Sequence, residues 1–249
     1  MTTDSTSSRR TIGLTTSYFA ILSLFAIPGR LCAKEPHARV WLTTRPDARE
    51  FGGIDGRLRE QEPQALAAIW RELDLQSGDT IVDIGAGSGK WLQGMADRVG
   101  SDGTVYGLEI KPNLVEGIKK KFEDTPQVRP WLGKPDRTGL PADSCDVGLM
   151  VKVYHHVAKD LRIDYLNSLR ETIRPGGRLV IVERHPLIPS KRKKTEPIHS
   201  MAPAKLLSDM HEAGWFPARF ELLPQSAYYV AVFVQRDVFE LDRRTSPDD

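Results

Sequence analysis

The chain has 249 residues, of which 40% are hydrophobic and 27% are charged, so it suits one sizeable α/β domain and is neither disordered nor fibrous. Its two cysteines, Cys32 and Cys145, exclude a disulfide-stapled scaffold and any four-thiolate metal site. The 35 Lys and Arg residues exceed the 33 Asp and Glu residues by two, and this excess lies within residues 1–33. Residues 34–249 are therefore neutral overall, and we expect no nucleic-acid partner that depends on broad neutralisation of phosphates.

The first 33 residues differ in composition from the rest of the chain. Arg9 and Arg10 precede the uncharged stretch of residues 11–29, and Ala33 offers a small residue at a cleavage point. This order is typical of an export signal, and the arginine pair partly resembles a twin-arginine signal. A membrane anchor through residues 11–29 is the alternative. We expect an exported, periplasmic or membrane-anchored protein, or a cytoplasmic one if this segment is no signal.

The remainder divides into three parts. Residues 34–62 have no clear periodicity and are expected to form an N-terminal cap segment. Pro63 suits a first helical position, and from there to residue 236 apolar, β-branched runs alternate with amphipathic helices. We expect residues 63–236 to form the main domain and residues 237–249 to form a polar tail.

The apolar runs of the main domain predict seven strands: Thr80–Ile84, Thr104–Glu109, Val128–Leu132, Asp146–Val151, Arg178–Val182, Phe220–Leu223 and Tyr228–Gln235. Strands separated by helices favour a parallel sheet with helices on both faces. Only residues 224–227 join the last two strands, which is too short for a crossover helix, so the final strand should be reversed. We therefore expect an α/β, doubly wound fold with a seven-stranded, mostly parallel sheet and an antiparallel final strand.

A glycine-rich loop closes the first strand and opens a helix. Gly85, Gly87 and Gly89 alternate with Ala86 and Ser88, so the backbone can turn tightly and approach a ligand. The N–H groups of the next helix then face an acceptor. Asp83 stands at the strand end, where a carboxylate can meet a cationic amine.

Two other nucleotide-binding motifs do not fit this loop. A dinucleotide fingerprint beginning at Gly85 requires glycine where Lys90 stands. A Walker A loop ending in Gly89-Lys90 requires Ser or Thr where Trp91 stands. The loop therefore indicates another nucleoside ligand.

Two more acids follow the next two strands. Glu109 ends the second strand beside Ile110, 26 residues after Asp83, and a carboxylate there can accept hydrogen bonds from both hydroxyls of a ribose. Asp136 lies in the loop of residues 135–141 after the third strand, where it can accept from an adenine amino group. We expect contacts with this ligand at Asp83, Glu109 and Asp136, and also at Ile110 beside Glu109.

Together these residues resemble the class I S-adenosylmethionine-dependent methyltransferases. Residues 83–89 match the family's first motif, Glu109 its ribose-binding acid, and Asp136 its adenine-contacting acid, while residues 174–181 match the turn and fifth strand of its fold. The resemblance covers Pro63–Arg236. It implies a Rossmann-like fold, S-adenosyl-L-methionine as cofactor and methyl transfer as the activity.

Three stretches narrow the likeness: residues 152–156, residues 135–141, and residues 213–215 followed by 228–233. They look like a bacterial group of small methyltransferases that often carry export signals and whose substrates are unassigned. The quinone-biosynthesis methyltransferases are a more distant likeness. Lys152, which the resemblance places at the cofactor, departs from the small or acidic residue usual at that position, and Lys134-Pro135 replaces the commoner Gly-Asp-Ala.

The residues just beyond strands four and five should face the acceptor. Methyl transfer requires donor and acceptor at attack distance and, for a hydroxyl or thiol acceptor, a group that removes a proton. We predict His155 or His156 as that base, because imidazole titrates near neutral pH. Tyr154, Glu183 and His185 are expected to contact the acceptor. The spacing of these histidines with Glu183 does not demand a metal ion, and none is predicted.

The sequence therefore predicts an S-adenosylmethionine-dependent methyltransferase with a small-molecule acceptor, and it leaves the oligomeric state open. Two alternatives remain: a non-catalytic nucleotide-binding protein of the same fold, and a nicotinamide-dependent oxidoreductase. One conflict also remains, because an exported enzyme would need S-adenosylmethionine outside the compartment that makes it.

Overall fold

A computed structural model describes residues 63–187, 199–223 and 226–236. The predicted export signal or anchor (residues 1–33), cap segment (34–62) and polar tail (237–249) lie outside this part of the chain. Within it, no helix combines the length and the apolar character that crossing a membrane requires.

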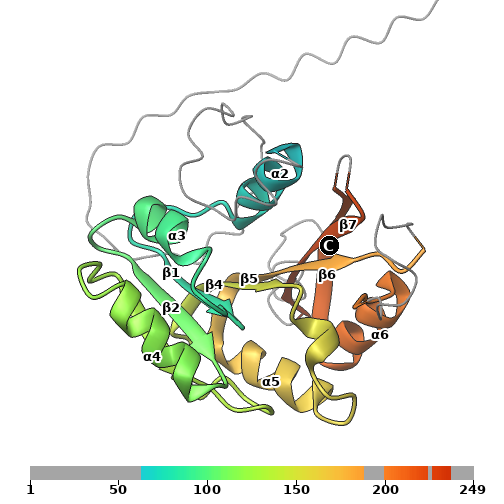
Figure 1. The fold of residues 1–249 in the computed structure, drawn as a ribbon. Helices are drawn as coiled ribbons and strands as arrows, with labels where there is room; N and C mark the ends of the chain where they lie inside the picture. Colours follow the sequence, from blue (N-terminus) through green and yellow to red (C-terminus); the bar gives the residue numbers. More distant parts are fainter. Residues whose placement is uncertain (1–62, 188–198, 224–225, 237–249) are drawn as a thin grey trace, which may run out of the picture. The chain divides into compact units, whose positions relative to one another are not determined.

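The main domain is built from alternating helices and strands (Figure 1). In chain order the elements are α2 (Pro63–Leu73), β1 (Thr80–Ile84), α3 (Leu92–Val99), β2 (Thr104–Glu109), α4 (Pro112–Lys121), β3 (Val128–Leu132), β4 (Cys145–Val151), the 3₁₀ helix η1 (Tyr154–His156), α5 (Arg162–Thr172), β5 (Ile173–Arg184), α6 (Pro203–Glu212), β6 (Trp215–Leu222) and β7 (Tyr228–Gln235).

The seven strands form one sheet in the order β3-β2-β1-β4-β5-β7-β6. The strands from β1 to β5 pair in parallel, and β7 runs antiparallel to both of its neighbours, β5 and β6. The predicted doubly wound sheet with one reversed final strand is confirmed. The chain crosses from the β3 edge back to β4 beside β1, so the carboxyl ends of β1 and β4 form the switch point where such folds bind ligands.

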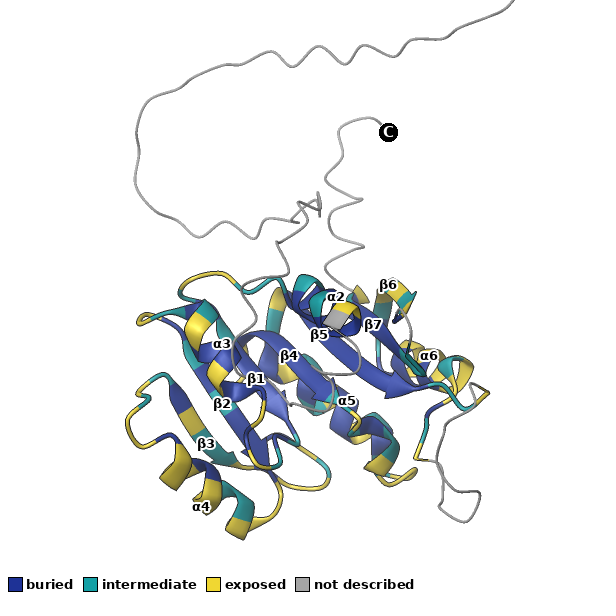
Figure 2. Cartoon of the chain, turned by 45° about the horizontal axis from the view of Figure 1, so that its top comes forward, coloured by how far each residue is buried: buried dark blue, intermediate teal, exposed yellow. Residues whose placement is uncertain are grey.

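Helices cover both faces of the sheet, and alternation along the strands supplies two cores. Ile81 belongs to the cluster that packs with α2, α3 and α4, whereas its neighbour Val82 belongs to the cluster that packs with α5 and α6. Figure 2 shows the consequence: the central strands are almost wholly buried, and exposed residues gather on the helices and on the β3 edge. Because both faces are covered, these strands read as continuous apolar runs in the sequence.

β5 and β6 extend well beyond their predicted bounds, and β4 begins one residue earlier than predicted, at Cys145. β5 begins at Ile173 rather than Arg178, because the Pro175-Gly176 turn residues stay within the strand next to an irregularity in its pairing with β4. β6 begins at Trp215 rather than Phe220, and its outer residues are exposed. It is an edge strand that contains Pro217, so it lacks the apolar run by which the buried strands are found.

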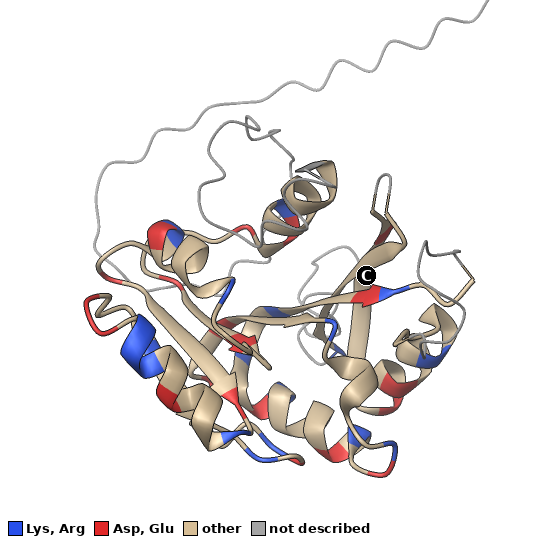
Figure 3. Cartoon of the chain, viewed as in Figure 1, with Lys and Arg blue, Asp and Glu red and all other residues tan. Residues whose placement is uncertain are grey.

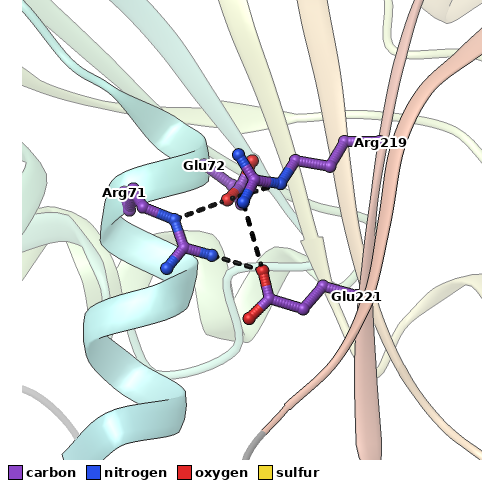
Figure 4. A network of polar contacts seen from close by, with 4 residues as sticks. All are labelled: Arg71, Glu72, Arg219 and Glu221. Carbon is purple, nitrogen blue, oxygen red and sulfur yellow. Dashed lines mark hydrogen bonds and ion pairs between the residues drawn. The ribbon is translucent and has the colours of Figure 1, made fainter. Parts of the chain in front are cut away.

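A polar network joins α2 to the edge strand β6 (Figure 4). Arg71 pairs with Glu72 at 2.8 Å and also with Glu221, while Arg219 reaches Glu72 at 3.3 Å and Glu221 at 3.5 Å. Each carboxylate is therefore shared between two guanidinium groups. This arrangement fixes α2, the first described helix, against the edge strand β6.

Candidate active site

The glycine loop after β1 needs glycine for two different reasons. Gly85, Gly87 and Gly89 all have positive φ, at 69°, 59° and 72°. A Cβ on Gly85 would lie 2.7 Å from Cγ2 of Val153, and one on Gly89 would lie 2.8 Å from the Phe122 ring. At Gly87 nothing in the described structure lies within 4 Å of that position, so the middle of the loop is open to a ligand.

Asp83, at the end of β1, is a buried acid with an unsatisfied oxygen. The residue is 2% exposed, and its Oδ2 has no hydrogen-bond partner among the described residues. Burial, and then the charge of Glu109, raise the pKa of Asp83 to about 7. A buried carboxyl group of this kind is stabilised in its charged form by a cationic ligand, which the ammonium group of a methionine moiety would supply.

Glu109 is held rigidly at the end of β2. The N–H of Gly87 donates to its Oε1 at 2.8 Å, and the N–H of Ile110 donates to its Oε2 at 3.1 Å. An ionised carboxylate has about four lone-pair sites, so both oxygens keep acceptor capacity for the two hydroxyls of a ribose. The structure thus brings Asp83, Glu109 and the glycine loop together as the sequence predicts, and their role in cofactor binding stays a prediction.

Exposed apolar residues stand beside this acidic pair. Ile110 follows β2 and is 48% exposed, and Leu132 ends β3 and is 53% exposed. β2 and β3 are neighbours in the sheet, so the two residues offer apolar surface on which a purine ring could lie. Leu132 was missed by the sequence reading, although an apolar residue at the end of an edge strand was the available signal.

Asp136 lies in the β3–β4 loop and is engaged by its neighbour. Arg137 donates to Asp136 Oδ2 from Nη2 at 2.5 Å and from Nε at 3.0 Å. The hydrogen bond from Arg137 is the main reason why the pKa of Asp136 is lowered. An adenine amino group would therefore share this carboxylate with Arg137, and the adenine contact remains a prediction.

Lys152 points toward a different part of the sheet. Its backbone has φ of 58°, an uncommon conformation for a non-glycine residue, and its N–H donates to Val182 O at 2.8 Å. Its ammonium group lies 5.9 Å from the centre of the Tyr228 ring on β7. The structure thus directs this side chain toward β7, whereas the resemblance assigns it to the cofactor.

Tyr154 is part of the core rather than of an open site. Its side chain is completely buried, and its hydroxyl donates to Asp209 Oδ2 on α6 at 3.0 Å. Burial raises the pKa of this phenol far above its usual value. The predicted acceptor contact therefore has no exposed surface at Tyr154, because α5 and α6 cover this face of the sheet.

His155 and Glu183 form a tight pair across strands β4 and β5. These two strands are neighbours in the sheet, and Val151 pairs with Val182. Glu183 is fully buried, and His155 Nδ1 donates to its Oε2 at 2.8 Å, while the His155 backbone N–H donates to its Oε1 at 3.2 Å. This leaves Nε2 of His155 as the ring nitrogen with a lone pair.

Three other histidines, His156, His199 and His185, lie in two different places. The rings of His156 and His199 lie beside that of His155, with centroids 4.0 and 5.5 Å from it. Burial lowers the pKa of His156, and the charges of His155, His199 and Lys111 act in the same direction.

His185 lies apart from this cluster. It accepts a hydrogen bond on Nδ1 from the Leu187 N–H at 3.2 Å and packs edge-on against Tyr229. His199 was missed by the sequence reading, because it lies 43 residues beyond His156 with no motif around it.

The acceptor side adjoins the glycine loop. Val153 comes directly before η1, and its side chain occupies the space that a Cβ on Gly85 would need. Lys111, two residues after Glu109, contributes to the electrostatics of His156. The loops after β1, β2 and β4 therefore meet at the carboxyl edge of the sheet, as the binding of two small substrates requires.

Comparison with known proteins agrees with this geometry. Residues 81–177 match a family described as "Methyltransferase domain". The chain is 33% identical over 111 residues to an uncharacterized 37.1 kDa protein in transposon TN4556 of Streptomyces fradiae, covering 45% of this chain and 32% of that protein. It is 28% identical over 139 residues to demethylmenaquinone methyltransferase of Lactococcus lactis, covering 51% of this chain and 53% of the enzyme. The chain thus spans about half or less of these relatives.

Among solved structures, the fold resembles a SAM-dependent methyltransferase from Aquifex aeolicus. The two agree with a TM-score of 0.61 at 18% identity, over 72% of this chain and 93% of that one. At this identity the likeness concerns the fold.

The sheet order, with the glycine loop and the acid that ends β2 at the carboxyl edge, is that of a doubly wound α/β domain of the methyltransferase fold. With the family match over residues 81–177, the chain contains a methyltransferase domain, and the predicted fold is confirmed. The same match supports the predicted enzyme class and, with it, S-adenosylmethionine as the cofactor.

Proposed function

We propose that this protein transfers a methyl group from S-adenosylmethionine to a small-molecule acceptor. The observation that carries the proposal is the pair of buried acids at the glycine loop. Glu109 is fixed by two backbone N–H groups, and Asp83 keeps an oxygen without a partner in the described structure. Two acids so arranged suit a ligand that has a ribose at one end and a cation at the other.

Two observations favour a small acceptor over a nucleic acid. Residues 34–249 carry equal numbers of basic and acidic side chains. Figure 3 shows both signs interspersed over the described domain, with a basic run confined to the last turn of α4 (Lys119, Lys120 and Lys121). Demethylmenaquinone methyltransferases among the relatives also act on a small molecule by name, which supports extending this class of acceptor to the present chain.

The residues divide the work of the reaction. Asp83 would pair with the ammonium group and Glu109 with the ribose, while Ile110 and Leu132 would cover the base. The bound cofactor supplies a methyl group on a positively charged sulfur. An acceptor would approach from the ends of β4 and β5, where His155 is oriented by Glu183. Proton removal by His155 or His156 remains a prediction, and Glu183 supports it by keeping the lone pair of His155 on Nε2.

The experiment is a calorimetric titration of the full chain with S-adenosylhomocysteine, compared with Glu109→Ala and with Glu116→Ala. Glu116 is an exposed glutamate on α4 and serves as the matched control. We expect binding by the wild type and the control, and its loss in Glu109→Ala. A folded wild type that binds NADH in preference would support the oxidoreductase alternative and contradict the proposal.

Transfer itself is measured by release of S-adenosylhomocysteine from S-adenosylmethionine with pooled small metabolites, including quinols, and separately with total RNA. Turnover with the metabolite pool is expected. Turnover with RNA alone would contradict the small-molecule acceptor. A chain that binds cofactor but turns over with neither would be the non-catalytic alternative.

A further inference from the structure

Three imidazole rings converge at the carboxyl end of β4. His155 and His156 come from η1, and His199 comes from the segment just before α6. The ring centroids lie 4.0 Å apart for His155 and His156, 5.5 Å for His155 and His199, and 5.3 Å for His156 and His199. Each ring offers one nitrogen such that the three nitrogens all lie within 4.8 Å of one another.

The environment of His155 Nε2 is a second, independent indication of a ligand. The His155 side chain is 8% exposed, and Nε2 is buried without a hydrogen-bond partner among the described residues. Leaving a buried polar atom without a partner is unfavourable, so such an atom in a folded protein calls for a specific explanation. A cation between the three rings would satisfy it.

Glu183 supports the cluster through the other ring nitrogen of His155, Nδ1. It accepts the Nδ1–H of His155 at 2.8 Å and is itself fully buried, so it fixes both the tautomer and the orientation of the ring. Histidine ligands of metals usually donate their second ring nitrogen to a carboxylate or carbonyl in this way. The carboxylate also increases the basicity of the ligating nitrogen.

We propose that His155, His156 and His199 bind one divalent transition-metal cation, with Zn²⁺ as the expected ion. Three neutral imidazoles suit Zn²⁺, Ni²⁺ or Cu²⁺, whereas Mg²⁺ and Ca²⁺ prefer oxygen ligands. Zn²⁺ is commonly held by three protein ligands with a fourth position left for water or a substrate. His156 and His199 are exposed, so such a position would be reachable from solvent.

This site differs from the sequence expectation of no metal. The set of residues considered there included Glu183 and His185, but Glu183 lies behind His155, and Nδ1 of His185 accepts from Leu187. His199 supplies the third ligand instead. The site does not depend on the proposed methyl transfer, although its place beside the glycine loop would put the ion on the acceptor side. With the ion bound, the lone pair of His155 Nε2 would be used in coordination, and this nitrogen would not remove a proton from the acceptor.

The test uses the full chain, freed of metal by dialysis against a chelator. Co²⁺ is added and its visible absorption recorded, and Zn²⁺ affinity is measured by calorimetry. The variants are His199→Ala and, as a matched control, His211→Ala on α6, an exposed histidine outside the cluster. Glu183→Gln tests the supporting carboxylate.

We expect one ion per chain with the strong absorption of tetrahedral Co²⁺ in the wild type and in His211→Ala. His199→Ala should lose that spectrum, and Glu183→Gln should weaken Zn²⁺ binding by about 10- to 100-fold. Absence of binding by the wild type, or equal binding by the wild type and His199→Ala, would overturn the proposal. Histidine acting only as a general base would give the first result, because a general base needs no metal ion. Because neither readout involves cofactor, failure here would leave the methyltransferase proposal untouched.

Discussion

The two halves of the carboxyl edge of the sheet are built in different ways. At β1 and β2 the site consists mainly of backbone: positive-φ glycines, N–H groups that hold Glu109, and the buried carboxyl group of Asp83. At β4 and β5 it consists of side chains on loops, with His155 anchored by Glu183 and with His156 and His199 exposed. The first half is local in sequence, and the second is assembled from distant segments.

The way each half is built determines how easily it can change by substitution. A backbone-built site tolerates few changes, because its geometry is encoded in glycine positions and strand ends, and it suits a ligand common to a whole family. A site built from loop side chains can change one residue at a time. The two halves should therefore respond differently to substitution.

The largest effect is expected from the buried charge of Asp83. Its pKa is raised from 3.8 to about 7 in the folded protein, so the folded chain holds this proton more tightly than the unfolded chain does. The contribution of this proton to the free energy of unfolding is therefore fully present below the unfolded-state pKa of 3.8. It is lost as the pH rises from there through the folded-state pKa of about 7. Without cofactor, raising the pH through this window should lower the free energy of unfolding of the wild type, relative to Asp83→Asn, by on the order of 4 kcal/mol.

Urea denaturation of both proteins across that pH range measures this difference. Parallel pH profiles for the wild type and Asp83→Asn would show that the carboxyl group is not perturbed. S-adenosylhomocysteine should flatten the wild-type profile, because its ammonium group stabilises the ionised carboxylate.

Gly85→Ala tests the backbone-built half. Its Cβ would lie 2.7 Å from Val153 at a φ of 69°, so we expect a loss of roughly 1–3 kcal/mol of stability together with loss of cofactor binding. Gly117→Ala on α4 is the matched control, since nothing described lies within 4 Å of that position. It should instead stabilise the protein by about 0.5–1 kcal/mol. Thermal unfolding and titration with S-adenosylhomocysteine measure both, and tolerance of alanine at Gly85 would contradict the account.

Tyr154→Phe tests the support beneath the histidine half. The change removes one buried hydrogen bond to Asp209, which keeps Lys205 at 2.6 Å and Arg162 at 3.5 Å. We expect a loss of about 1 kcal/mol in the free energy of unfolding with cofactor affinity unchanged. A fall in cofactor affinity comparable with that of the Glu109 variant would mean that the two halves are not separate.

Arg219→Ala, on the edge strand β6, serves as the reference outside both halves and should have the smallest effect. Arg219 is 39% exposed and shares Glu72 and Glu221 with Arg71, which remains after the change. The expected loss is about 1 kcal/mol or less, reduced further by salt. A larger loss in urea denaturation would show that the α2–β6 network contributes more than exposed ion pairs usually do.

The same contrast explains which parts of the fold and of the site could be predicted from the sequence. The bounds of β1, β2, β3 and β7 follow from apolar runs, and Asp83 and Glu109 lie where strand ends place them. Tyr154 could not be assigned to the core, because its partner Asp209 is 55 residues away on α6. His199 could not be found because only tertiary folding brings it to His155. The predicted range of β6 was too short, because an edge strand with exposed polar residues lacks the apolar pattern of a buried strand.

The most direct test of the account is one set of calorimetric titrations with S-adenosylhomocysteine in metal-free buffer, on the full-length wild type, Asp83→Asn and His199→Ala. The account predicts that the wild type and His199→Ala bind equally and that Asp83→Asn loses binding, because only the β1–β2 half holds the cofactor. Retained binding by Asp83→Asn, or loss of binding in His199→Ala, would contradict it.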